Sequence, residues 1–166
     1  MLLDVRPILR QPGKSLTFSF ELDLSDVEFN GRHPISRPVA VEGSVRNSAD
    51  VLWMEMTERS TLDAVCDRCT KDFLLDKEIA YSCMLAEELQ DEENDDIVLL
   101  EEGKVDLEDL ARTVFILEMD TKTLCSEDCK GLCPRCGVDL NHGVCTCGKE
   151  VDPRLAVLAK LLENKE

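Results

Sequence analysis

The cysteines are the residues whose type and spacing most clearly indicate chemistry. Six of the nine cysteines lie close together near the C-terminal end of the 166-residue chain. There, Cys133-Pro-Arg-Cys136-Gly137 has the form of a zinc knuckle, in which two thiolates three positions apart bind one ion. The glycine can adopt the positive φ that points backbone N–H groups at sulfur. Cys145 and Cys147 complete a predicted four-sulfur site.

The pair Cys145 and Cys147 needs a particular local geometry to share an ion. In an extended strand, residues i and i+2 are about 6.5–7 Å apart. Sulfurs around one zinc are only about 3.7 Å apart, because each Zn–S bond is about 2.3 Å long. We therefore expect a tight turn at this pair, and Gly148 is placed to permit one.

Two other cysteine pairs have open assignments. Cys125 and Cys129 are four positions apart and would face the same way on one helical turn. They either replace one pair of the main site, bind a second ion or are simply buried thiols. Cys66 and Cys69 form a possible separate metal site in a turn between strands. A thioredoxin-type redox pair is disfavoured there, because no helical pattern follows.

The expected role of the metal is structural. A closed site of four sulfurs leaves no coordination position for a substrate, so we expect zinc to act as a staple. A disulfide framework would need an oxidising compartment, and the sequence shows no secretory signal. Iron–sulfur ligation is another alternative, since the 129–136 spacing resembles that of radical enzymes that use S-adenosylmethionine, but those enzymes need a large barrel.

The composition restricts the class of partner. The formal net charge is −16, from 35 acidic and 19 basic residues. Affinity for bare nucleic acid comes from neutralising phosphates, so this charge disfavours DNA and leaves direct binding to naked RNA open only through a local basic face. A basic protein or a basic patch on a larger particle fits better. No apolar run is long enough to span a bilayer, and we expect a cytoplasmic protein without membrane contact.

The elements that must position the cysteines are mainly strands. Between residues 16 and 24, Leu and Phe alternate with polar residues, which is typical of a half-buried strand. Consecutive strands with short connections predict an α+β fold with an antiparallel β-sheet or a small β-barrel as its core. The expected strands are 2–9, 16–24, 37–46, 51–57, 60–66, 72–85 and 97–100.

Two helices are expected in the C-terminal half. Asp106 can cap the first helix, whose apolar residues from Leu107 to Phe115 follow helical spacing. The second helix would begin at Asp152, with Pro153 in its first turn.

These elements suggest two parts of one compact unit. Residues 1–120 would form a β-rich body that includes an acidic linker over 86–96 and the first helix. Residues 121–166 would form the cysteine-rich, zinc-knuckle-like metal segment and the terminal helix.

No catalytic residues can be assigned, and we do not expect an enzyme. His33 lies in a predicted loop, and His142 is interpreted as an exposed turn residue rather than a ligand. Neither has a nucleophile arranged near it in sequence. There is no glycine-rich phosphate loop. Cys83 is interpreted as a buried thiol on a strand.

The assembled motifs resemble the YceD-like family, named for large ribosomal RNA subunit accumulation and long described as a domain of unknown function. The resemblance rests on Cys66-Asp-Arg-Cys69, the acidic linker before Val105-Asp106-Leu107, the segment from Cys125 to Asn141, and the closing Asp152-Pro-Arg-Leu-Ala-Val-Leu158. It looks like the branch that keeps the C-terminal cysteines. Other members lack that cluster, which supports a structural role for the metal.

The resemblance implies a role in accumulation or processing of the large-subunit ribosomal RNA. Combined with the charge, it suggests a factor that binds a basic ribosomal protein or a precursor of the large subunit. Two alternatives remain. One is direct RNA binding through a local basic face, formed if the sheet gathers Arg32, Arg37, Arg46, Arg59 and Arg68. The other is a zinc and thiol redox sensor.

Overall fold

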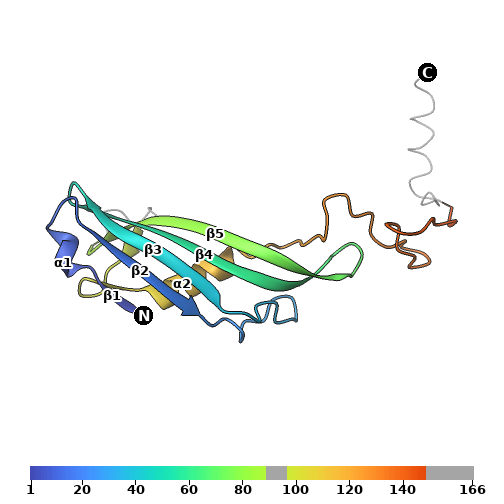
Figure 1. The fold of residues 1–166 in the computed structure, drawn as a ribbon, viewed down its shortest axis with the longest axis horizontal. Helices are drawn as coiled ribbons and strands as arrows, with labels where there is room; N and C mark the ends of the chain where they lie inside the picture. The colour runs from blue at the N-terminus through green and yellow to red at the C-terminus, as the bar shows by residue number, and fades with distance from the viewer. Residues whose placement is uncertain (89–96, 149–166) are drawn as a thin grey trace, which may run out of the picture.

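The computed structural model describes residues 1–88 and 97–148, and a long twisted β-sheet dominates it (Figure 1). The five-stranded sheet has the order β2-β3-β4-β5-β6, and β1 pairs with β7 in a separate two-stranded sheet. The elements are β1 (Leu2–Asp4), α1 (Arg6–Leu9), β2 (Ser15–Leu22), β3 (Val39–Ser48), β4 (Val51–Val65), β5 (Asp72–Ala86), β6 (Ile97–Leu99), β7 (Lys104–Asp106) and α2 (Leu107–Leu117).

The centre of the sheet is an antiparallel hairpin of two 15-residue strands, β4 and β5. Strands β2 to β5 are antiparallel throughout, which confirms the predicted antiparallel sheet. The two strands expected over 51–57 and 60–66 are one continuous strand, β4. The short strand β6 joins β5 in parallel, a pairing that the sequence did not indicate.

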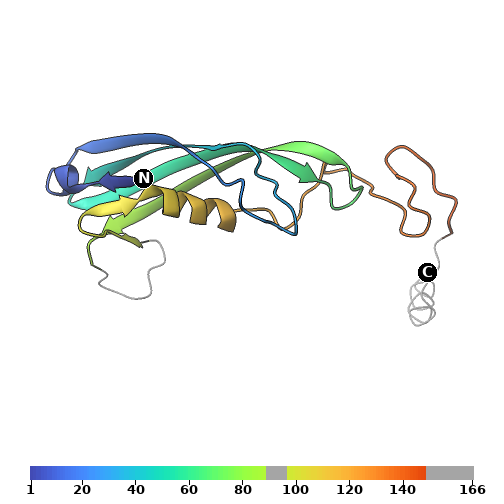
Figure 2. The same cartoon turned by 90° about the horizontal axis from the view of Figure 1, so that it is seen from below.

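The sheet is open, so the expected alternative of a small barrel is wrong. The edge strands β2 and β6 do not pair with each other in the described chain. The inner face is covered by other elements. Helix α2 lies below the sheet (Figure 2) and contributes Leu107, Ala111, Val114 and Phe115 to the core. The β2–β3 connection adds further buried side chains, among them Ile35. The helix and the loop thus bury part of this face, and Val5, Ile8, Leu100 and Val105 also belong to the core, which makes the structure α+β.

The alternation of β4 determines which side chains face the core. Leu52, Met54, Met56 and Leu62 are buried on its inner face. Glu58 follows the same alternation and is fully buried with them. The sheet therefore encloses one carboxylate among apolar side chains.

The helices match the sequence in part. Asp106 caps α2, and its side chain accepts a hydrogen bond from the N–H of Glu108 at 3.1 Å. The strand expected over 2–9 ends at Asp4, because Pro7 lies in the first turn of α1. The second expected helix, from Asp152, lies outside the described residues. Neither described helix has the length and hydrophobicity needed to span a bilayer.

The cysteine-rich segment follows α2 and extends beyond the end of the sheet formed by the β4–β5 connection (Figure 1). The division of the chain into units at residues 1–120 and 121–166 remains a prediction.

Candidate metal centres

Eight of the nine cysteines gather in two groups of four, and all nine are free thiols. Within each group, all sulfur atoms lie within 4.8 Å of one another. Site 1 consists of Cys66, Cys69, Cys125 and Cys129, and site 2 consists of Cys133, Cys136, Cys145 and Cys147.

Each site is built on a loop with the same backbone geometry. In site 2, the N–H of Gly137 donates to the carbonyl of Cys133 at 2.9 Å, and Gly137 has a φ of +72°. In site 1, the N–H of Thr70 donates to the carbonyl of Cys66 at 2.8 Å, and Thr70 has a φ of 59°. Cys66-Asp-Arg-Cys69 is therefore a second knuckle, in which threonine occupies the left-handed position that glycine usually takes.

Site 1 joins the sheet to the segment that follows α2. Its knuckle lies in the connection between β4 and β5, and its other two cysteines come from residues 125–129. The Sγ atoms of Cys66 and Cys129 are 3.7 Å apart, and those of Cys69 and Cys125 are 3.6 Å apart. Three of the four residues are buried, Cys125 being the exception. A metal here would fix the cysteine-rich segment to the tip of the central hairpin.

Site 2 is more exposed to solvent than site 1. The Sγ atom of Cys145 lies 3.2 Å from that of Cys133 and 3.7 Å from that of Cys136. The expected tight turn is present, because the N–H of Cys147 donates to the sulfur of Cys145 at 3.3 Å. Gly148 does not contribute a positive φ to it. Cys136 and Cys147 are exposed, so solvent reaches this site.

Residues 129–141 pack closely on the knuckle Cys66–Cys69 and connect the two sites. The guanidinium of Arg68 donates to the carbonyl of Cys129 at 2.7 Å, and the N–H of Leu132 donates to the carbonyl of Arg68 at 2.9 Å. Gly131 has a φ of +74°, and a Cβ added there would lie 2.8 Å from the Arg68 carbonyl oxygen. Asn141 donates to the sulfur of Cys129 at 3.5 Å. The same segment therefore carries one cysteine of site 1 and two of site 2 and is held against the Cys66–Cys69 loop.

The geometry and the donor set fit one tetrahedral ion per site. Four sulfurs around one zinc would be about 3.7 Å apart, close to the distances in site 1 and to one distance in site 2. A disulfide would need an S–S distance of about 2.05 Å. An iron–sulfur cluster distributes its cysteines over several irons, farther apart than around one ion. Soft thiolate ligands in a closed tetrahedron are typical of a structural ion.

The pKa values of the thiols favour the binding of a cation. Hydrogen bonds from backbone N–H groups, first that of Cys125, lower the pKa of Cys66 to about 6. The N–H groups of Cys136 and Arg135 lower the pKa of Cys133 to about 6. The interaction with Cys69 raises the pKa of Cys125 to about 12. Each site thus holds a readily formed thiolate, while the raised pKa values of Cys125 in site 1 and Cys147 in site 2 oppose further ionisation unless a cation compensates the charge.

The structure therefore groups the candidate ligands in a way that the sequence left open. Cys133, Cys136, Cys145 and Cys147 lie together as expected, but metal binding by them remains a prediction. The pairs Cys66/Cys69 and Cys125/Cys129, which the sequence presents as separate candidates, belong to one group. The matching Cys-x-x-Cys spacing of the two knuckles is the sequence feature that indicates two similar metal sites. His142 is exposed at 81% of its side chain and is outside both groups, and Cys83 is buried.

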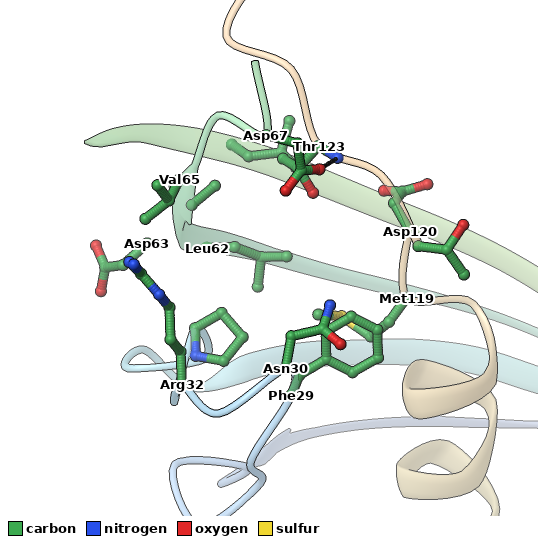
Figure 3. Close-up of a pocket in the computed structure, with 14 residues that line it drawn as sticks. Phe29, Asn30, Arg32, Leu62, Asp63, Val65, Asp67, Met119, Asp120 and Thr123 are labelled. Atoms are coloured by element: carbon green, nitrogen blue, oxygen red, sulfur yellow. Dashed lines mark hydrogen bonds between the residues drawn. The ribbon is translucent and has the colours of Figure 1, made fainter. Parts of the chain in front are cut away.

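A small pocket lies beside site 1, between the end of β4, the loop that carries Phe29 and the segment after α2 (Figure 3). The N–H of Asp67 donates to the carbonyl of Thr123 at 2.9 Å, and the Asp67 carboxylate accepts from the N–H of Thr123 at 2.6 Å. The pocket volume is about 80 Å³. Ligand pockets usually measure about 300–1,000 Å³, so this one is too small for a typical substrate.

Comparison with known proteins then identifies the family. The model of the family described as "Large ribosomal RNA subunit accumulation protein YceD" matches residues 54–162. The chain belongs to this family. The match begins within β4 and includes all eight cysteines of the two sites.

The chain is similar to three groups of relatives of different lengths. The uncharacterized protein YlbN of Bacillus subtilis is 26% identical over 161 residues, which cover 95% of this chain and 94% of that protein. An uncharacterized protein of Mycobacterium tuberculosis is 34% identical over 70 residues, 42% of this chain and only 34% of its own length. The chloroplastic YCED homolog 1 of Arabidopsis thaliana, named as a large ribosomal RNA subunit accumulation protein, is 31% identical over 67 residues, 38% of this chain and 21% of its own length. No solved structure matches the chain significantly.

Proposed function

We propose that this protein supports accumulation of the large-subunit ribosomal RNA as a non-enzymatic factor in the cytoplasm. It acts by binding a basic ribosomal protein, or a protein-rich part of a large-subunit precursor. The family description and the name of the Arabidopsis relative support the role in RNA accumulation. The net charge of −16 supports protein recognition rather than contact with naked RNA.

Four of the five arginines considered for an RNA-binding face have partners within the protein, and this observation carries the proposal. Arg37 pairs with Asp63 at 3.2 Å, and Arg59 pairs with Glu78 at 3.1 Å. Arg46 lies 3.9 Å from Glu55. Arg68 donates to backbone carbonyls beside site 1. The carboxylates beside Arg37, Arg46 and Arg59 offset the positive potential that would attract phosphate.

Both sites hold Zn²⁺ in this proposal. Zinc would keep all four thiols of each group ionised and would fasten the cysteine-rich segment to the hairpin. The chain's own residues then position the segment, through Arg68, Asn141 and Gly131.

The test is affinity capture of the tagged protein from cells, with and without RNase treatment of the lysate. Basic ribosomal proteins should remain bound in the treated sample, and depletion of the protein should lower the level of large-subunit RNA. Partners that disappear with RNase, or tight binding of purified protein to naked large-subunit RNA at physiological salt, would contradict the proposal and support direct RNA binding.

A second candidate function is a thiol sensor, favoured by the exposure of site 2. Cys136 and Cys147 are open to solvent, whereas most of site 1 is buried. Oxidation by a peroxide would join two thiolates as a disulfide, pass two electrons to the peroxide and release the ion. Partner binding that is lost on mild peroxide treatment and restored by reductant and zinc would support this function.

A further inference from the structure

A groove lies between β6, β7 and the outer side of α2. Its volume is about 560 Å³, and its apolar lining includes Leu2, Val98, Leu99 and Leu110. Leu2 is 66% exposed and Leu99 is 47% exposed. Large apolar side chains that lie together and are exposed to solvent are typical of a surface that a partner covers.

Helix α2 extends this apolar lining beyond the groove. Leu110, Thr113 and Leu117 are spaced at i, i+3 and i+7, so they share one face of the helix. Leu117 is 77% exposed. The rise of a helix places Leu117 about 10 Å farther along the axis than Leu110. Leu110 and Leu117 therefore continue the apolar surface of the groove along α2, with Thr113 between them.

The groove also borders an available strand edge. Strand β6 is the last strand of the sheet as far as residues 1–88 and 97–148 show, and it pairs with β5. Within the described residues, its other edge has no strand partner. An unpaired edge is a template for an extended segment of another chain, which gains backbone hydrogen bonds there.

The rim of the groove is acidic. Residues 101–109 contain five carboxylates and one lysine. The amino group of Met1 pairs with Asp106 and Glu108. Glu101 and Asp109 line the groove and form no ion pair with any residue in the described ranges. These two carboxylates are placed to meet cations that a partner brings to the groove.

We propose that this groove binds an extended, basic segment of a ribosomal protein. Apolar side chains of the segment lie on Leu99 and Leu110, its backbone follows β6, and its lysines or arginines pair with Glu101 and Asp109. This inference rests on the proposed function and adds the surface that binds the ribosomal protein. The metal sites then have a separate, structural role, which is to hold the cysteine-rich segment.

The test uses the full chain, immobilised, and the purified total protein of large ribosomal subunits as the probe, at about 0.15 M salt. One variant removes the charge of the rim, E101K/D109K, and another removes apolar contacts, L99S/L117S. Matched controls are E42K/E55K on the outer face of the sheet and L74S, a leucine that is 61% exposed elsewhere. Circular dichroism checks that every variant is folded.

Both groove variants should retain at least about tenfold less of the basic ribosomal proteins, and both controls should stay within about twofold of the wild type. A photo-crosslinker at Thr113 should join to a segment rich in lysine or arginine with apolar neighbours. Equal retention by the groove variants and the wild type would overturn the assignment of the groove as the binding surface, while leaving the proposed function intact. No retention by the wild type would overturn both. A crosslink between two copies of this chain would replace the proposal with self-association.

Discussion

Replacing Glu58 by glutamine should stabilise the protein, and the gain should grow with pH. Glu58 lies in the middle of β4, between Val41 of β3 and Ile79 of β5, and its side chain is fully buried. Neither carboxylate oxygen has a hydrogen-bond partner among the described residues. Burial alone raises the pKa of Glu58 from 4.5 to about 7, with no neighbouring charge contributing. Glutamine has nearly the same shape and does not ionise.

The sign and size follow from linkage. The folded state favours the protonated acid, so this residue lowers stability as pH rises above the unfolded pKa of 4.5. A shift from 4.5 to about 7 corresponds to about 3 kcal/mol once both states are ionised. Between pH 6 and pH 8.5, the difference between E58Q and the wild type should grow by about 1 to 1.5 kcal/mol. This equals a change in Tm difference of about 3 to 6 °C.

Thermal unfolding of zinc-loaded protein at both pH values provides the assay. The matched control is E55Q, three positions earlier on the same strand, where the carboxylate is exposed and lies 3.9 Å from Arg46. Its Tm difference from the wild type should not change with pH. If E58Q and the wild type keep the same difference at pH 6 and pH 8.5, Glu58 is not an isolated buried carboxylate and the description of the core is wrong.

Three further predictions concern the metal segment and α2. G131A should destabilise the docking of the cysteine-rich segment by about 2 kcal/mol, because the new Cβ meets the Arg68 carbonyl and the residue has positive φ. Faster limited proteolysis after α2 would show this loss, and unchanged cleavage would contradict it. A chelator should remove the ion of site 2, with exposed Cys136, well before that of site 1, where Cys66 is buried, and release in two kinetic phases would report this order. D106A should cost about 1 kcal/mol in urea unfolding, since it removes the side-chain cap of α2, and a loss near zero would show that the cap is not needed.

The sequence predicted the strands well because their side chains alternate. Strand β2 and the hairpin β4–β5 follow period two, and each pairs with its neighbour in sequence. Strands β6, β1 and β7 have three residues each, too short for any period to identify their partners. The open sheet could not be distinguished from a barrel for the same reason, because closure depends on how the edges pair.

The metal ligands were predictable within each loop but not across the chain. The form of Cys133-x-x-Cys136-Gly137 indicates a knuckle by itself. Joining Cys66 to Cys129 requires knowing that the β4–β5 connection meets the segment after α2, 63 residues later in sequence. Glu58 was accessible to sequence reasoning in principle, since it continues the inward positions of β4 from Leu52 to Met56. The strands expected over 51–57 and 60–66 leave residue 58 in a connection, so its burial is not predicted.

The count of zinc ions per chain, by native mass spectrometry of protein purified under reducing conditions, tests the arrangement of the eight thiols most directly. Two ions should be bound per wild-type chain. The variants C69S and C136S should each bind one, with the sheet still folded in both. A single ion in the wild type, no ion at all, or loss of both ions from either variant would contradict two separate four-sulfur sites.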